Sequence, residues 1–460
     1  MTSPARIVRC IRCGLAASLS FAVVHALEPC RIDIVDADSG WPVPLVELRT
    51  THEVRFVSDN AGVIAFDLPE LMGVETWFTV EGHGYGVPRD GYGYHGIRLT
   101  PMPGKRLTVK VKREVPAKRL GRITGAGLFA ESQQLGLEST WRDQGIMGCD
   151  SVQVAVHQGK LHWLWGDTTL ARYPLGLFHM IGATTALQPL PSLEPPVRLR
   201  YDYVMSAAGK HRVVGRMAGE GPTWINGLVS LPDRDGGTRL VATYVKVEPP
   251  LRAYESGQCI WDDAGARFEA HRVLWKKTVD DPKLPPGPGG HPVFYTDAAG
   301  KAWVLFGDPF PRLKCAATFE AWSDPPTWQR LTPQASVPSR DGEAITPHRG
   351  SIAWNAFRGK WVAIFTQVGG TSSYLGEVWY AESREPTGPW GPAVKVLSHA
   401  KYSFYNPCIH AGLSPAGSPI LLFEGTYTRE FAHQARATPR FNYNQVLYRL
   451  DLDDPEFARD

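Results

Sequence analysis

Apolar residues along this chain gather into five short runs that share one layout: a turn, then aromatic and branched residues, then a polar stop. The five runs span residues 159–169, 238–247, 300–310, 358–368 and 418–428. Equivalent positions in successive runs are 79, 61, 59 and 59 residues apart. Each run is too short for a core helix and rich in β-branched or aromatic residues, so each predicts a buried strand.

The segments beside these runs extend the pattern. A shorter apolar segment precedes each run, and an alternating segment follows several of them, for example residues 376–383 and 444–452. Strand, turn, strand, loop and strand make up a meander, and repetition at a nearly fixed period predicts a radial or stacked array. We therefore expect an all-β fold in which residues 126–455 form a five-bladed β-propeller. A two-sheet sandwich of irregular length would explain the strands but not the period.

Residues 28–114 have a different texture, with short alternating strands separated by turns such as Asp38-Ser39-Gly40 and Ala61-Gly62. The last of these strands covers residues 106–114. This segment resembles the small prealbumin-like or carboxypeptidase-regulatory-like β-sandwich, which implies a spacer, stabiliser or docking module without chemistry of its own. The polar stretch 115–125 is expected to be a linker.

The first 26 residues predict a signal peptide that is not part of the fold. Arg6, Arg9 and Arg12 precede an apolar stretch at 15–24, and Val24-His25-Ala26 suits cleavage. The alternative is an uncleaved N-terminal helix, but the stretch is too short to span a bilayer. We expect a periplasmic or secreted protein.

Charge and cysteine content narrow the partners. Without the signal segment the chain has 46 basic and 46 acidic residues, so neither nucleic-acid binding nor membrane insertion is expected. The five remaining cysteines lie far apart without metal-ligand spacing, which favours buried free thiols, although one or two disulfides would suit an exported protein. We expect a monomer without a cofactor; a single divalent ion in the channel is compatible with the pattern, but no ligand set can be named.

A propeller brings the starts of its innermost strands together around one central funnel. The residues at these starts are mostly polar or aromatic: Asp150, Trp224, Asn226, His291, His348, Arg349, Tyr405 and Asn406. Acids or amides at adjacent strand ends form a second ring: Asp167, Asp308, Gln367, Glu377 and Glu424. Some of these acids can be ordinary turn formers, Asp308 above all.

Paired carboxylates of this kind are what glycosidic cleavage needs. One carboxyl must be protonated to donate to the leaving oxygen, and the other must be ionised to attack or to activate water. Asp150 is the candidate nucleophile or base, because its place at a strand start directs it inward. Asp167 is the first candidate for the general acid, with Glu424 as the alternative.

Two further features have two readings each. Trp224 stands at a strand start, where it would either stack on a sugar ring or belong to a blade core. Polar residues including Arg440 and Tyr443 crowd the tail at 423–445. They would either cover the funnel mouth and contact substrate, or clasp the last blade to the first.

The run CDSVQVAVHQGKLHWLWGDTTL, together with the repeat, resembles the five-bladed propeller glycosidases. It is most similar to a bacterial family named only as a domain of unknown function, some members of which cleave D-arabinan. The resemblance implies that Asp150 and Asp167 are the paired acids.

The sequence thus predicts an exported glycoside hydrolase that cleaves a polysaccharide or oligosaccharide. Two alternatives stay open. A polysaccharide lyase would use a base and a cation drawn from Tyr405, His410, His348 and Arg349. A propeller without catalysis would bind glycans or proteins.

Overall fold

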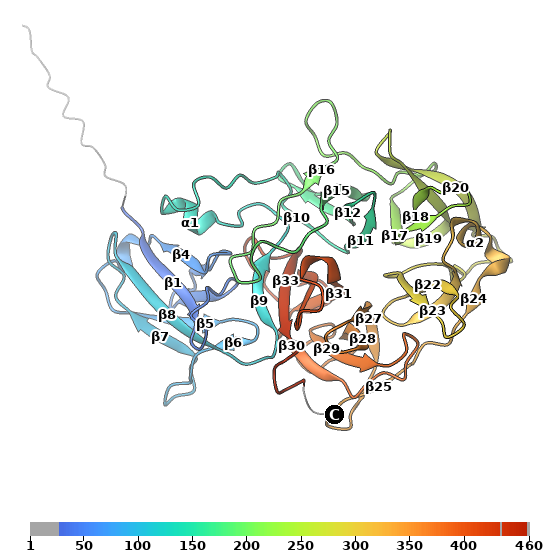
Figure 1. The fold of residues 1–460 in the computed structure, drawn as a ribbon. Helices are drawn as coiled ribbons and strands as arrows, with labels where there is room; N and C mark the ends of the chain where they lie inside the picture. The colour runs from blue at the N-terminus through green and yellow to red at the C-terminus, as the bar shows by residue number, and fades with distance from the viewer. Residues whose placement is uncertain (1–26, 433–434, 458–460) are drawn as a thin grey trace, which may run out of the picture.

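The computed structural model describes residues 27–432 and 435–457. The predicted signal peptide, residues 1–26, lies outside the described residues. The expected all-β class is confirmed, because the regular secondary structure of the described chain consists almost wholly of strands (Figure 1). The two α-helices of this part are one turn long: α1 (Ala130–Gln134) and α2 (Phe319–Ser323).

The N-terminal strands form two four-stranded sheets, with strand orders β4-β1-β8-β6 and β3-β2-β5-β7. Their bounds are β1 (Cys30–Asp36), β2 (Glu47–Thr50), β3 (Arg55–Val57), β4 (Val63–Phe66), β5 (Thr76–Glu81), β6 (Tyr85–Gly86), β7 (Gly96–Leu99) and β8 (Arg106–Arg113). Buried side chains from both sheets, such as Ile32 and Phe78, form one apolar core. We call these strands the sandwich.

Five further four-stranded antiparallel sheets follow one another around a ring (Figure 1), and we call them the first to fifth blades. The first is β11 (Gln153–His157), β12 (Lys160–Trp165), β15 (Ile181–Ala186) and β16 (Asp202–Tyr203). The second is β17 (Thr223–Pro232), β18 (Thr238–Glu248), β19 (Arg252–Asp262) and β20 (Arg267–Lys276). The third is β21 (Val293–Thr296), β22 (Ala302–Gly307), β23 (Pro311–Ala316) and β24 (Gln329–Arg330). The fourth is β27 (Pro347–Asn355), β28 (Lys360–Gln367), β29 (Glu377–Ser383) and β30 (Val394–Ser398).

The fifth blade joins the two ends of the ring. It consists of β31 (Ser403–Ile409), β32 (Ile420–Thr428), β33 (Asn444–Asp451) and β9 (Lys118–Arg122). Strand β9 comes from the segment 115–125, which was expected to be a linker. That segment instead pairs with β33 and completes the last sheet.

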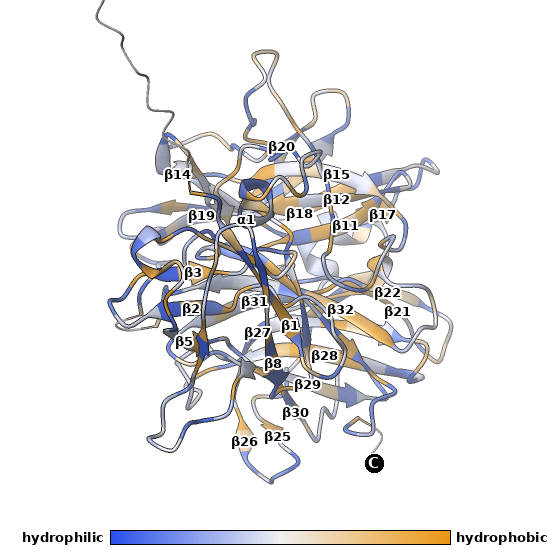
Figure 2. Ribbon diagram, turned by 90° about the vertical axis from the view of Figure 1, so that its left-hand side faces the viewer, coloured by the Kyte–Doolittle hydropathy of each residue, from blue (hydrophilic) through white to orange (hydrophobic). Residues whose placement is uncertain are grey.

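The five apolar runs of the sequence become the second strands of the five blades: β12, β18, β22, β28 and β32. Most of their residues are buried, so the period reflects one repeated core position. In Figure 2 the blade strands carry most of the hydrophobic colour, while many connecting loops are hydrophilic.

Several inner strands are interrupted where they enter the ring. Register shifts occur between Asn226 and Val229 in the second blade and between Tyr405 and Cys408 in the fifth. In the first blade the interruption is wider and separates β10 (Gly148–Cys149) from β11. Bulges of this kind turn side chains away from the regular alternation of a strand.

Two small sheets decorate the ring. Strands β10, β13 (Thr168–Leu170) and β14 (Tyr173–Leu177) form a three-stranded sheet immediately after Asp167. Strands β25 (Val337–Pro338) and β26 (Ala344–Ile345) pair on their own. The hairpin of β13 and β14 was not predicted from the sequence.

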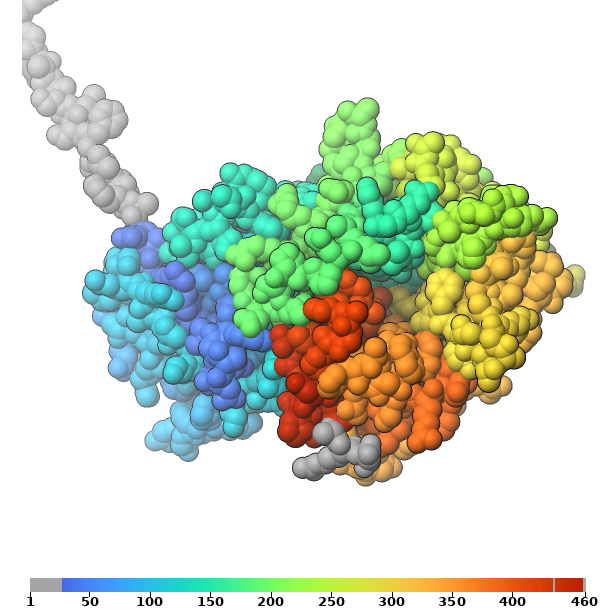
Figure 3. All heavy atoms as spheres, in the orientation of Figure 1, coloured from blue at the N-terminus to red at the C-terminus, as the bar shows by residue number. Residues whose placement is uncertain are grey.

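The sandwich packs against the fifth blade (Figure 3), and buried arginines of β9 form the joint. Arg119 donates to the carbonyls of Pro44, at 2.9 Å, and of Leu45, at 3.1 Å, and its Nε donates to the Tyr448 hydroxyl. Asn60 of the sandwich exchanges two hydrogen bonds with the backbone of Arg122. A buried guanidinium needs several acceptors, and here the sandwich supplies them.

The five cysteines from Cys30 onward are free and buried, as expected. None of the described helices is both long and apolar enough to cross a membrane.

Candidate active site

Asp150 lies in the interruption between β10 and β11. Tyr405 of the fifth blade donates its hydroxyl to Asp150 Oδ2 at 2.7 Å, and Tyr443 also bonds to this carboxylate. Burial raises the pKa of Asp150, and the hydrogen bonds from the two tyrosines lower it in part. Gly166 passes directly beneath the carboxylate, where any side chain would collide with Oδ1.

Asp167 lies between β12 and β13, next to Asp150. Trp224 of the second blade donates its indole N–H to Asp167 Oδ1 at 3.0 Å. Burial and then the negative charge of Asp150 raise the pKa of Asp167 to about 7, against a smaller lowering by the Trp224 bond. The carboxyl group therefore still carries its proton in slightly acidic solution.

The two tyrosines remain donors throughout the physiological range. Burial and the nearby carboxylates raise the pKa of both Tyr405 and Tyr443, so neither phenol ionises in the presence of Asp150. Tyr405 is buried and packs edge-on against Phe431, whose side chain is 56% exposed. Phe431 therefore adds an open aromatic surface beside the site.

The two carboxyl groups have different environments although they are neighbours. The anion of Asp150 is stabilised by two phenols, the Ser151 side chain and the backbone N–H of Asp167, whereas that of Asp167 receives one indole N–H. Hydrogen bonds to the charged form favour it, so Asp150 is the better anion and Asp167 the better acid. We call Asp150, Asp167, Trp224, Tyr405 and Tyr443 the acid cluster.

The third acid proposed from the sequence lies elsewhere. Glu424 on β32 is fully buried, and its Oε1 lies 2.6 Å from His410 Nε2. The other oxygen, Oε2, has no hydrogen-bond partner within the part of the chain that the structure describes. Because a general acid must touch its substrate, this fully enclosed carboxyl group has no part in the site that we assemble.

Two asparagines expected to bind substrate connect blades instead. Asn226 Oδ1 accepts the backbone N–H of Gly290 at 2.6 Å, which ties the second blade to the third. Asn406 donates to Ser151 Oγ at 2.6 Å, which ties the fifth blade to the first. Both side chains hold their neighbours at the entry to the ring.

His291, His348 and Arg349 form a second polar group around Asp308. Arg349 lies 3.7 Å from Asp308 Oδ2, and Gly350 donates its N–H to Oδ1 at 2.8 Å. Burial lowers the pKa of both histidines, which keeps them neutral. Arg349 is about half exposed, so its guanidinium remains open to a ligand.

Arg440, also expected in the substrate site, lies at the joint with the sandwich. Its guanidinium pairs with Glu131 of α1, and its carbonyl accepts a hydrogen bond from Arg122. Three residues later, Tyr443 reaches Asp150. The tail thus clasps the ring through Arg440 and contributes Tyr443 to the acid cluster.

Among residues 27–432 and 435–457, no three His, Cys, Asp or Glu side chains are grouped in a way that would hold a metal ion. Neither Gly166 nor Phe431 was singled out from the sequence. Gly166 lies within the W-G-D-T motif, which was the available signal; Phe431 lies in an irregular loop and had none.

Sequence comparison finds no relative of this chain, and structural comparison finds similar folds at low identity. No family model and no curated protein matches the chain. An exo-1,5-α-L-arabinanase from a bovine ruminal metagenomic library is similar over 67% of this chain and 94% of its own, with 9% identity and a TM-score of 0.40.

Two other solved structures are similar at comparable levels. An exo-β-1,3-galactanase from Phanerochaete chrysosporium shares 10% identity over 67% of this chain and 61% of its own, with a TM-score of 0.37. An N-acetylgalactosamine deacetylase from F. plautii shares 9% identity over 68% and 91%, also with a TM-score of 0.37. Values this low establish no shared activity.

Proposed function

We propose that the protein is a glycoside hydrolase whose reaction takes place at the acid cluster. The observation that carries this proposal is the pairing of two partly buried carboxyl groups with different hydrogen-bond donors, one of them with a pKa of about 7. Structural ion pairs combine opposite charges, whereas this pair combines like charges. Such an arrangement suits a reaction that needs one acid and one base.

In this reaction Asp167 donates its proton to the leaving glycosidic oxygen. Asp150 either attacks the anomeric carbon or removes a proton from the water that attacks it. One product gains a hydrogen and the other a hydroxyl, so one water is consumed for each bond cleaved. Tyr405 and Tyr443 hold the Asp150 carboxylate in position and ionised, and Trp224 holds Asp167.

The substrate that we propose is a polysaccharide or oligosaccharide, with D-arabinan first in line because of the resemblance in the sequence around Asp150 and Asp167. The N-terminal pattern supports an exported protein, and we propose that it acts as a monomer.

The lyase alternative is weakened by the state of Tyr405. A base for β-elimination must release its own proton, but the pKa of this phenol is raised well above its usual value and the group already donates to Asp150.

The test is mass spectrometry of products from wild type and Asp150→Asn on a panel that includes D-arabinan and polygalacturonate. We expect products that carry one added water from wild type. The variant should be slower by about 10⁴-fold while its melting temperature is retained, because the amide oxygen still accepts from Tyr405. If D-arabinan is cleaved, NMR of the first-formed anomer then distinguishes attack by Asp150 from attack by water.

Unsaturated products would establish a lyase instead. Full activity in Asp150→Asn would remove the acid cluster from the chemistry. An absence of products from every chain in the panel would favour a binding propeller.

A further inference from the structure

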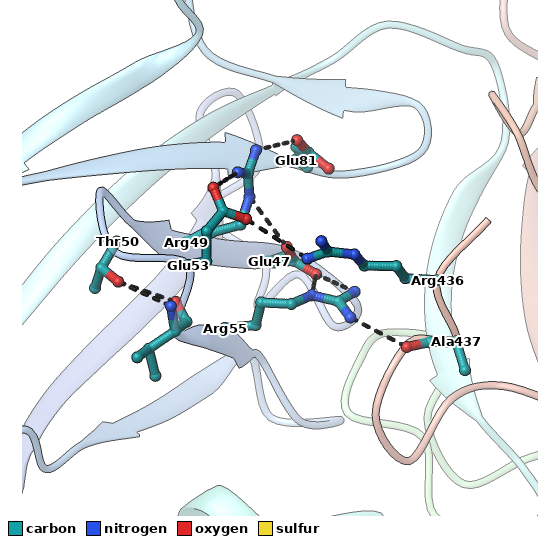
Figure 4. A network of polar contacts seen from close by, with 9 residues as sticks. Glu47, Arg49, Thr50, Glu53, Arg55, Glu81, Arg436 and Ala437 are labelled. Atoms are coloured by element: carbon teal, nitrogen blue, oxygen red, sulfur yellow. Dashed lines mark hydrogen bonds and ion pairs between the residues drawn. The ribbon is translucent and has the colours of Figure 1, made fainter. Parts of the chain in front are cut away.

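A cavity of about 640 Å³ lies between the sandwich and the fifth blade, and no residue of the acid cluster lines it. Strands β2, β3 and β5 supply one wall, and residues 400–402 and 435–438 with Tyr427 supply the other. Figure 4 shows the polar side chains that meet across it.

Ion pairs fix most charged groups of this cavity. Arg49 binds Glu53 at 2.7 Å and Glu81 at 3.0 Å. Arg55 binds Glu47 at 2.6 Å and also donates to the carbonyl of Ala437 in the fifth blade at 3.2 Å (Figure 4). The side chains are therefore held in place before any ligand arrives, which reduces the entropy lost on binding.

The lining carries no net charge. Its acidic members are Glu47, Glu53, Glu81 and Glu114, and its basic members are Arg49, Arg55, Lys401 and Arg436. His83 adds no charge at neutral pH, because burial lowers its pKa to about 3. A phosphate or a uronate could pair only with the basic side chains, and a polyamine only with the acidic ones. A neutral polyhydroxylated ligand can accept hydrogen bonds from the guanidinium groups and donate hydrogen bonds to the carboxylates.

Aromatic rings stand beside these polar groups. Tyr85 and Tyr402 line the cavity. Gly86 and His95 also line it, and the loop between them carries Tyr92 and Tyr94. The side chains of Tyr92 and Tyr94 are 91% and 66% exposed.

The loop that carries these two tyrosines is ordered by one carboxylate. Asp90 Oδ1 accepts the backbone N–H groups of both Tyr92 and Tyr94 at 2.9 Å. The rings are thus presented on a fixed turn, and large exposed aromatic groups at low conformational cost are a common means of contacting a ligand.

We propose that this cavity, with the Tyr92–Tyr94 loop at its edge, is a second, non-catalytic binding site for a neutral glycan chain. The charge balance, the planar hydrogen-bonding groups and the aromatic rings carry the proposal. The choice of a glycan among neutral ligands rests on the proposed function of the acid cluster. The sandwich would then hold the polysaccharide while the propeller acts on it.

Affinity electrophoresis of the whole protein through gels containing D-arabinan, 1,5-α-L-arabinan, β-1,3-galactan or polygalacturonate tests this. Ala400→Trp fills the cavity from an exposed turn without removing an ion pair, and Tyr92→Ala/Tyr94→Ala removes the rings but leaves the Asp90 turn intact. Ala298→Trp, in an exposed turn of the third blade, is the matched control. The background is Asp150→Asn, so that no polysaccharide is cleaved.

We expect retardation by at least one neutral polysaccharide, with an apparent dissociation constant raised about tenfold by Ala400→Trp and by the double tyrosine variant. Ala298→Trp should migrate like its parent. Equal retardation of all variants, retardation by polygalacturonate alone, or none in any gel would overturn the proposal.

The two proposals fail separately. If Ala400→Trp loses binding and the wild type releases no products, the proposed binding site is supported and the proposed hydrolase activity is contradicted. If the wild type cleaves a polysaccharide and Ala400→Trp binds as its parent does, the hydrolase activity is supported and the binding site is contradicted.

Discussion

The joint between sandwich and ring and the acid cluster both bury ionisable side chains, but they treat the charges differently. At the joint, Arg119 is 2% exposed and is surrounded by carbonyl oxygens and by the faces of Tyr85 and Tyr448. At the acid cluster, burial and then the charge of Asp150 raise the pKa of Asp167, and uncharged hydrogen-bond donors such as Tyr405 and Trp224 lower the pKa of the carboxyl groups that they contact.

This difference separates a structural from a functional use of burial. The guanidinium of Arg119 donates to carbonyl oxygens of the sandwich and to the Tyr448 hydroxyl of the fifth blade, so the group holds two parts of the chain together. The acid cluster leaves a repulsion that is relieved when one carboxyl group keeps its proton. Such a pair suits the proton transfer that we propose for the acid cluster.

The largest effect should come from Asp167→Asn. An amide cannot donate the proton that the leaving oxygen needs, so we expect kcat to fall by about 10²- to 10⁴-fold with natural glycosidic leaving groups. With an aryl glycoside whose leaving group needs no proton, the same variant should stay within a few-fold of wild type. An equal loss on both substrates would mean that Asp167 is not the acid.

Arg119→Ala should affect stability and not chemistry. It leaves several buried carbonyl groups without a donor, and we expect the free energy of unfolding in urea to fall by about 3 kcal/mol. The folded fraction should keep the kcat of wild type. Arg252→Ala, which removes a surface ion pair at 3.8 Å, is the control and should leave the unfolding midpoint unchanged.

The burial of Asp167 beside Asp150 should also be visible as pH-dependent stability. The pKa of Asp167 is about 7 in the folded protein against 3.8 for the ordinary group, so the folded state holds the proton more tightly. This contribution to stability is complete below pH 3.8, declines as the pH rises, and is lost above 7.

Asp167→Asn removes this dependence. We therefore expect the variant to be more stable than wild type at pH 8 by about 1 to 3 kcal/mol, and to lose that advantage towards pH 4. Urea unfolding at both pH values measures it. A variant that is less stable than wild type at pH 8 would show that Asp167 is not strained.

The smallest effect should come from Trp224→Phe. The change removes the indole N–H that lowers the pKa of Asp167 and keeps an aromatic ring. The alkaline limb of the pH–rate profile should move upward by less than about one unit, with the plateau of kcat nearly unchanged. A downward shift would contradict the assigned donor.

The regular part of the fold was predictable from the sequence because it rests on local patterns. The second strands are short apolar runs rich in aromatic and β-branched residues, which predicts buried strands. Their nearly constant spacing predicts the ring. Asp150 and Asp167 were predictable as a pair because they flank β11 and β12, which are neighbouring strands of one blade.

Long-range pairings were not predictable in the same way. Strand β9 has a polar sequence because its arginines find acceptors in the sandwich and in the tail, which no local pattern reveals. Glu424 was assigned to the site because it stands at a predicted strand end, and Arg440 because polar residues crowd the tail. Packing placed Glu424 inside the fifth blade and Arg440 at the joint. The side chains of Asn226 and Asn406 form hydrogen bonds to neighbouring blades.

The pairing of β9 with β33 also has a consequence for the order of synthesis. A ribosome releases Lys118–Arg122 long before Asn444–Asp451, so the ring cannot close until nearly the whole chain has been made. Until then β9 follows the sandwich without its partner strand β33, so its edge is unpaired. A chain truncated before Asn444 keeps that edge open, which exposes prematurely terminated copies to aggregation and proteolysis.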